Sequence, residues 1–130
     1  MSAAFDTIEL KMPFKAEYVS IARLTASGVA NRLGFDIETI EDIKVAIAEV
    51  CNKLVRAGSK SEDNYNVIFN MYSNKLEIFF ACQDKSLKCI FNDGEDELGI
   101  SIISALMDSV EFCSEGIYLL TMTKALEGDE

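Results

Sequence analysis

The strongest constraint on the fold is a pair of β-prone runs in the middle of the chain. "NYNVIFNMYS" (64–73) and "NKLEIFFACQ" (74–83) are rich in aromatic and β-branched residues and meet at Ser73 and Asn74. Two such runs joined by a short polar turn predict a β-hairpin. An all-helical fold is therefore excluded, and the rest of the chain must pack against a sheet.

Further strands are expected at both ends of the chain. "TIELKMPF" (7–14) alternates apolar with charged residues and ends at Pro13, the only proline, which predicts a strand with one buried face. "VEFCSEGIYLLTMTKAL" (110–126) predicts a second hairpin that turns at Glu115 and Gly116. A brief strand is also expected from Leu87 to Phe91.

Three segments carry apolar residues at helical spacing. The first is 15–34, closed by Gly34, and the second is 35–58, with Asp36 as N-cap and Gly58 at its end. The third is 98–110. The predicted inward stripes are, in order, Tyr18, Ala22, Thr25 and Val29; Ile40, Ile43, Ile47, Val50 or Cys51, and Leu54; and Ile102, Ile103, Leu106 and Val110.

The order strand, two helices, hairpin, helix, hairpin predicts a two-layer α/β sandwich. We expect a mixed, mostly antiparallel sheet with about three helices on one face, and a single domain spanning residues 1–130. The other face of the sheet would be solvated or used as an interface.

Composition narrows the function classes. A net charge of −10 and a pI near 4.4 disfavour nucleic acid as a partner. No segment approaches the run of about 18 apolar residues that a membrane span needs, and the N-terminus has no basic start, so we expect a cytoplasmic protein. Four cysteines without CxxC spacing and the absence of histidine argue against zinc sites and Cys/His catalysis, and favour buried, reduced thiols.

Four blocks resemble a known family. "EYVSIARLTASGVANRLGF", "IEDIKVAIAEVCNKLV", "ELGISIISALMDSV" and "MTKALEG" are similar, in this order, to blocks of the bacterial anti-sigma-factor serine kinases of the GHKL (Bergerat-type) ATPase superfamily. The resemblance covers nearly the whole chain and implies the histidine-kinase-like ATPase fold, which agrees with the sandwich inferred from the pattern. It also implies that three short elements hold Mg-ATP.

The first element is a helical Glu that acts as general base, followed four residues later by an Asn that coordinates magnesium. Glu49 matches the Glu, but the Asn position falls on Lys53, while Asn52 comes one residue early. A helix advances about 100° per residue, so Asn52 would reach the required direction only through a π-bulge. A charged Lys has no lone pair to ligate a cation, and Glu before Lys at i, i+4 favours an ion pair instead.

The other two elements are degenerate as well. In the second element, an Asp-x-Gly, the Asp binds adenine. Cys82 occupies the Asp position here, and a thiol is a weak hydrogen-bond acceptor. Asp84 occupies the Gly position, where it places a charge instead of a small residue. In the Gly-rich opening of the third helix, Leu98 and Gly99 match, but Asp96 and Glu97 replace glycines and would repel phosphates. The segment from Cys82 to Leu98 is also shorter than the ATP lid of family kinases.

The first helix matches the family best. The resemblance implies that its Arg, here Arg23, contacts a sigma factor and an anti-anti-sigma (STAS-type) partner, although a solvated helix Arg fits the pattern equally. The first hypothesis is an anti-sigma-like binding module, a homodimer like its relatives, with lost or weakened ATP binding and no cofactor. The alternatives are an active serine kinase that uses Mg-ATP, with Glu49 as base and Asn52 shifted into place, and a pocket altered for another small molecule.

Overall fold

The computed structural model describes residues 3–87, 90–92, 97–112 and 118–126. It contains five strands, three α-helices and short 3-10 turns. In chain order these are β1 (Asp6–Pro13), η1 (Ala16–Tyr18), α1 (Val19–Leu33), α2 (Ile37–Ala57), β2 (Asn64–Met71), β3 (Lys75–Ala81), η2 (Lys85–Leu87), η3 (Ile90–Asn92), α3 (Glu97–Leu106), β4 (Ser109–Phe112) and β5 (Tyr118–Ala125).

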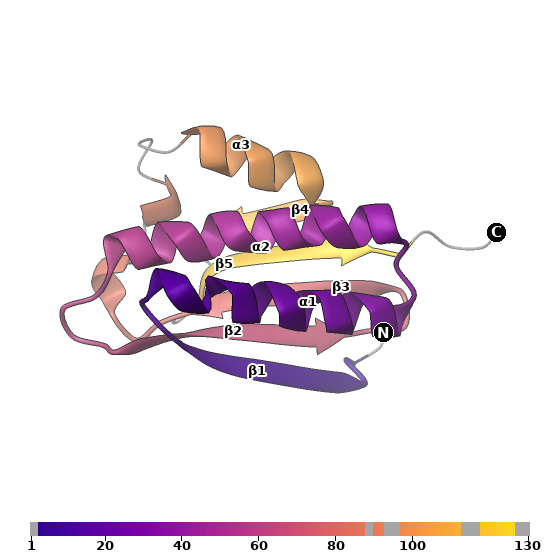
Figure 1. Cartoon of the computed structure of the whole chain (residues 1–130), viewed down its shortest axis with the longest axis horizontal. Coiled ribbons are helices and arrows are strands. Elements are labelled where there is room, and N and C mark those ends of the chain that lie inside the picture. Colours follow the sequence, from indigo (N-terminus) through magenta and orange to yellow (C-terminus); the bar gives the residue numbers. More distant parts are fainter. Residues whose placement is uncertain (1–2, 88–89, 93–96, 113–117, 127–130) are drawn as a thin grey trace.

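The strands form one sheet with three helices over one of its faces (Figure 1). The strand order is β1-β2-β3-β5-β4, and every pair of neighbouring strands is antiparallel. The predicted two-layer α/β sandwich is therefore confirmed. The described sheet is antiparallel throughout rather than mixed.

The predicted capping residues mark the end of α1 and both ends of α2, whereas α1 begins at Val19, later than the start of the predicted segment 15–34. Asp36 Oδ1 accepts a hydrogen bond from Thr39 N at 2.8 Å and caps α2. Gly34 ends α1 with a φ of 96°, the left-handed conformation that glycine adopts without a steric cost. All of the predicted inward stripe of α2 is buried, including both Val50 and Cys51.

The inward stripe of α1 differs from the prediction by about one residue. Val19, Ala22, Ala26, Val29 and Ala30 are its buried residues, whereas Tyr18 is 41% exposed and Thr25 is half-buried. Tyr18 belongs to the 3-10 turn before α1, so it does not follow the 3.6-residue period of the helix.

The C-terminal part of α3 was predicted wrongly. The helix ends at Leu106 instead of Val110, because Asp108 N donates to Thr123 O at 2.9 Å and begins the pairing of β4 with β5. Val110 lies in β4 opposite Met122. The segment from Leu87 to Phe91 has 3-10 turns at its described ends instead of a strand. The predicted turn at Glu115 and Gly116 lies outside the described residues.

The core lies between the helices and the sheet. Its fully buried side chains include Phe69, Phe80 and Ile43. Cys51 and Cys82 are buried free thiols, while Cys89 and Cys113 lie outside the described residues. Burial raises the pKa of Cys51 to about 11. None of the described helices is both long and apolar enough to cross a bilayer.

Candidate functional site

The C-terminal half of α2 carries the first group of predicted site residues. Glu49, Asn52 and Lys53 are half-buried, and α2 packs against α3. The helix is α-helical from Ile37 to Ala57, so it has no π-bulge that would turn Asn52 into the direction of Lys53. Lys53, and not Asn52, therefore lies one helical turn after Glu49 on the same side of α2.

The predicted ion pair between Glu49 and Lys53 does not form. Within the described part of the chain, no salt bridge joins the carboxylate of Glu49 to the ammonium of Lys53. Lys53 does take part in an interaction.

Cys82 follows directly after β3 and points into the protein. Its side chain is 3% exposed, and its Sγ lies 3.6 Å from the backbone oxygen of Asn64, to which the thiol donates. Burial raises the pKa of the thiol, so it remains protonated at neutral pH. The group at this position is a hydrogen-bond donor to the backbone at the start of β2.

Asp84 joins the loop after β3 to the loop after α2. Its Oδ2 accepts a hydrogen bond from Ser59 Oγ at 2.5 Å, and its Oδ1 accepts from Ser86 N and Oγ at 2.9 and 2.7 Å. Ser59 Oγ in turn accepts from the backbone N–H groups of Ser61 and Glu62. The hydrogen bonds from Ser59 and Ser86 lower the pKa of the Asp84 carboxyl below its ordinary value.

These two loops line a cleft of about 510 Å³ at the C-terminal end of α2. Its walls carry hydroxyl groups of Ser59, Ser61 and Ser86, the carboxylate of Asp84 and the side chain of Lys60, beside apolar groups. The hydroxyls of Ser59 and Ser86 and the Asp84 carboxylate bond to one another, so much of the polar lining is already paired. Sequence reasoning missed Ser59, because it lies 25 residues before its partner.

The start of α3 supplies the last predicted positions. The helix begins at Glu97, Leu98 is 74% exposed and Gly99 is buried and engaged in an interaction. Asp96, which was expected to repel phosphates, lies outside the described residues. The structure thus brings α3 beside α2, but it orients Leu98 toward solvent.

Arg23 lies apart from this cluster, on α1. It is exposed, and its neighbours Ile21 and Leu24 are 47% and 69% exposed. The guanidinium of Arg23 and these two apolar side chains therefore face solvent on α1.

Comparison with known proteins identifies the fold family. Residues 12–124 match the histidine kinase-like ATPase domain. The chain belongs to the histidine kinase-like ATPase family. The serine-protein kinase RsbW of Bacillus thuringiensis (strain Al Hakam) is 35% identical over 148 positions, which cover 100% of this chain and 91% of the relative. The RsbW of Halalkalibacterium halodurans is 36% identical over 140 positions, covering 96% and 86%. The resemblance found in the sequence is thereby confirmed.

For a member of this ATPase family, the residues at the expected nucleotide positions have unsuitable chemistry. Lys53 presents an ammonium group, which repels magnesium, and the Cys82 thiol already donates to a backbone oxygen. No cluster of three or more metal-ligating side chains occurs among the described residues.

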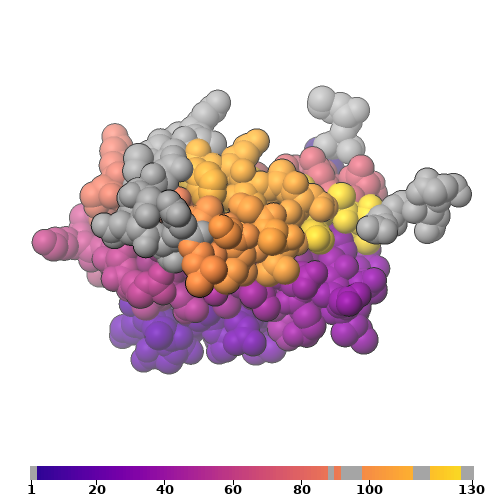
Figure 2. Space-filling view, turned by 90° about the horizontal axis from the view of Figure 1, so that it is seen from above, coloured from indigo at the N-terminus to yellow at the C-terminus, as the bar shows by residue number. Residues whose placement is uncertain are grey.

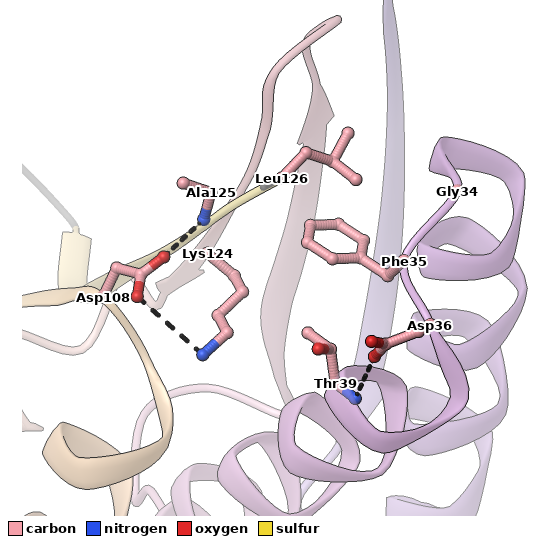
Figure 3. A pocket seen from close by; sticks show the side chains of 8 residues that line it. All are labelled: Gly34, Phe35, Asp36, Thr39, Asp108, Lys124, Ala125 and Leu126. Atoms are coloured by element: carbon pink, nitrogen blue, oxygen red, sulfur yellow. Dashed lines mark hydrogen bonds and ion pairs between the residues drawn. The ribbon is translucent and has the colours of Figure 1, made fainter. Parts of the chain in front are cut away.

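A second pocket, of about 260 Å³, lies at the opposite end of α2 in this ATPase-like domain (Figure 3). Lys124 Nζ donates to Leu106 O at 2.7 Å and lies 3.8 Å from Asp108 Oδ1, while Asp108 Oδ2 accepts from Ala125 N at 2.6 Å. These contacts tie the end of α3 to β5. The pocket's polar groups are thus paired with one another, and we assign them a structural role.

Proposed function

We propose that this protein is an anti-sigma-factor-like regulator that binds a sigma factor, an anti-anti-sigma (STAS-type) protein, or both, and does so without ATP. Full-length similarity to RsbW kinases supports the regulatory class. The single observation that carries the loss of nucleotide dependence is Lys53, a cation on an uninterrupted helix at the expected magnesium-ligand position.

The residues around Lys53 support the same conclusion. Cys82 is buried and donates its proton to Asn64 O, so it offers the adenine amino group no acceptor comparable to a carboxylate. Asp84 uses both carboxylate oxygens to hold Ser59 and Ser86. The Asp84 contacts stabilise two loops, and the Cys82 contact ties the end of β3 to β2. At both positions, a contact within the protein replaces the ligand contact expected of an ATP site.

The length of the alignment supports a reduced lid. The match to the Bacillus thuringiensis relative spans 148 positions, whereas this chain has 130 residues, so at least 18 positions have no counterpart here. The short segment between Cys82 and Leu98 is the place where we infer that these residues are missing. A shorter lid would leave a nucleotide open to water and weaken its binding further.

Partner binding is assigned to α1. Arg23 offers five fixed donors to a partner carboxylate, and Leu24 adds exposed apolar surface beside it. By analogy with the family resemblance, we also propose that the active form is a homodimer in the cytoplasm.

The second candidate is an active serine-protein kinase. The printed name of the relatives, serine-protein kinase RsbW, and the presence of Glu49 at the expected general-base position favour it. It requires a group other than Lys53, such as Asn52, to bind magnesium, because a charged lysine has no lone pair for a cation.

The test uses a purified sigma factor and a purified STAS-type protein from the same genome as candidate binding partners, and measures binding by biolayer interferometry. We expect binding whose affinity does not change when Mg-ATP is added. Arg23→Ala should weaken it about tenfold or more, as for an interface anchor, while Arg32→Ala, another exposed arginine of α1, should leave it unchanged.

Two outcomes would contradict the proposed function, and a third would contradict the proposed binding surface. Failure of both candidate partners to bind would remove the regulatory role. Transfer of phosphate from ATP to a partner serine, lost in Glu49→Gln, would establish the kinase instead. Equal affinity of the Arg23→Ala variant would remove Arg23 from the binding surface.

A further inference from the structure

The cleft at the C-terminal end of α2 is large enough for a small molecule. Its volume of about 510 Å³ lies in the range of small-molecule sites, about 300–1,000 Å³. Figures 1 and 2 show the loop after α2 and the segment after β3 at the same end of the molecule, where α2 terminates. Glu49 and Lys53 are not among the described residues that line this cleft, which are Ala57, Gly58, Ser59, Lys60, Ser61, Asp84, Ser86, Leu87 and Ile90.

The polar side of the cleft offers hydrogen-bond acceptors. Asp84 is ionised at neutral pH, because hydrogen bonds from Ser59 and Ser86 lower the pKa of its carboxyl, and a carboxylate can only accept. The hydroxyls of Ser59 and Ser86 therefore donate their protons to it. Ser59 Oγ also accepts from Ser61 N and Glu62 N, which occupies both of its lone pairs. Ser86 Oγ keeps its lone pairs for a ligand.

These acceptors favour a positively charged donor. A ligand group that meets Ser86 Oγ beside the Asp84 carboxylate has to donate hydrogen bonds, and a primary ammonium supplies three donors. Hydrogen bonds with an ionised partner are shorter and stronger than those between neutral groups. The hydroxyl of Ser61, which also lines the cleft, is a further acceptor of the same kind.

Lys60 brings the opposite charge to the same cleft. It is exposed, and within the described ranges no salt bridge joins its ammonium to Asp84 or to another carboxylate. Lys60 would repel a ligand that is only cationic, and Asp84 would repel one that is only anionic. A ligand that carries both charges meets an opposite charge at each end.

The remaining wall of the cleft is apolar. Leu87 is buried, Ile90 is half-buried, and Ala57 lies at the end of α2. An aliphatic group that covers these side chains gains free energy by leaving water. The cleft thus combines an acceptor side with a negative charge, a lysine and an apolar wall.

We infer that this cleft binds a free aliphatic α-amino acid as its zwitterion. The ammonium group of the ligand lies against Ser86 Oγ and the Asp84 carboxylate, its carboxylate reaches Lys60, and its side chain packs on Leu87 and Ile90. The bound amino acid bridges the loop after α2 and the segment after β3. This site adds a small-molecule input to the protein, goes beyond the proposed function and does not depend on it.

Isothermal titration calorimetry of the full chain with L-leucine and three analogues tests each part of the site. The analogue 4-methylpentanoate lacks the ammonium group, 3-methylbutylamine lacks the carboxylate, and glycine lacks the side chain. We expect saturable binding of leucine. Each analogue should bind about tenfold more weakly or worse, because it loses one of the three contacts.

Variants assign the two charges. Lys60→Gln should weaken leucine binding about tenfold or more without weakening that of 3-methylbutylamine. Asp84→Asn should weaken leucine binding without weakening that of 4-methylpentanoate. Ser86→Ala leaves the hydrogen bond between Ser59 and Asp84 in place and should also weaken leucine binding. The matched control is Lys85→Gln, an exposed lysine outside the cleft lining, which should leave the affinity unchanged.

Three outcomes would overturn the inference. The first is the absence of saturable leucine binding up to millimolar concentration. The second is an analogue with one charge that binds as tightly as leucine, because a site for a single charge would then suffice. The third is unchanged leucine affinity in Lys60→Gln and Ser86→Ala, which would place the ligand elsewhere. None of these results bears on partner binding by α1, which is measured separately.

Discussion

Cys82 and Asp84 have direct partners in the fold, at positions where the family resemblance implies contacts to adenine. The Cys82 thiol donates to Asn64 O from a buried site, and Asp84 links Ser59 to Ser86. Lys53 adds a cation one turn after Glu49. At the scale of single residues, Cys82 links the end of β3 to the start of β2, and Asp84 links the loop after β3 to the loop after α2.

The structural role of position 82 can be tested by substitution. Cys82→Asp would bury a carboxylate against the carbonyl oxygen of Asn64, and we expect it to lower the free energy of unfolding by about 2 kcal/mol. Cys82→Ser retains a donor and should cost less. Urea unfolding followed by circular dichroism measures both. A Cys82→Asp variant as stable as the wild type would mean that this position opens to solvent or ligand.

Asp84 should make stability depend on pH. Hydrogen bonds from Ser59 and Ser86 lower its folded-state pKa below 3.8, so its contribution is fully present above that pH and is lost as the pH falls through the lower folded value. Wild type should exceed Asp84→Asn in stability at neutral pH, and the difference should shrink below pH 3.8. A difference that is constant across this range, in urea unfolding, would refute the assignment.

Residue-level prediction succeeded where the evidence is local in sequence. Neighbouring residues were enough to predict the helix caps at Gly34 and Asp36. The contact between Ser59 and Asp84 could not, because it depends on two loops that only the sheet brings together. The ion pair of Glu49 with Lys53 was expected from the i, i+4 spacing alone, and no salt bridge joins the two side chains in the described part of the chain.

At the scale of elements, the turn between α1 and α2 determines how the two helices pack. Gly34 adopts a φ of 96°, and its N–H reaches Ala30 O and Asn31 O. Gly34→Ala should lower the free energy of unfolding by about 1 kcal/mol, because an L side chain is strained there, although a Cβ would meet no atom within 4 Å.

The matched control for this turn is Gly34→Asn. Asparagine tolerates the left-handed conformation better than alanine, so it should cost less. Thermal unfolding ranks the three proteins. Equal stability of the alanine and asparagine variants would show that backbone strain does not govern this position.

Element types were predicted more reliably than element ends. The periodicity of α2 is long and uninterrupted, so its stripe was predicted correctly. The apolar run from Leu98 to Val110 crosses from α3 into β4, and its composition does not mark the change. Long-range pairing of Asp108 with Thr123 ends the helix, and no local pattern encodes it.

At the scale of the molecule, the sandwich could be predicted but the strand order could not. β5, the last strand of the chain, lies between β3 and β4 in the sheet. This insertion leaves β1 and β4 as the edges, and their exposure decides which surfaces can meet another protein. The order is set by burial of the most apolar strands at the centre, a property of the whole chain.

The whole-molecule account holds that the ATPase fold is retained while its nucleotide dependence is lost. A single calorimetric titration of Mg-ATP into the purified protein tests this most directly. Lys53, Cys82 and Asp84 together predict no heat of binding at sub-millimolar nucleotide. A clear isotherm with micromolar affinity would contradict the account and support an active kinase.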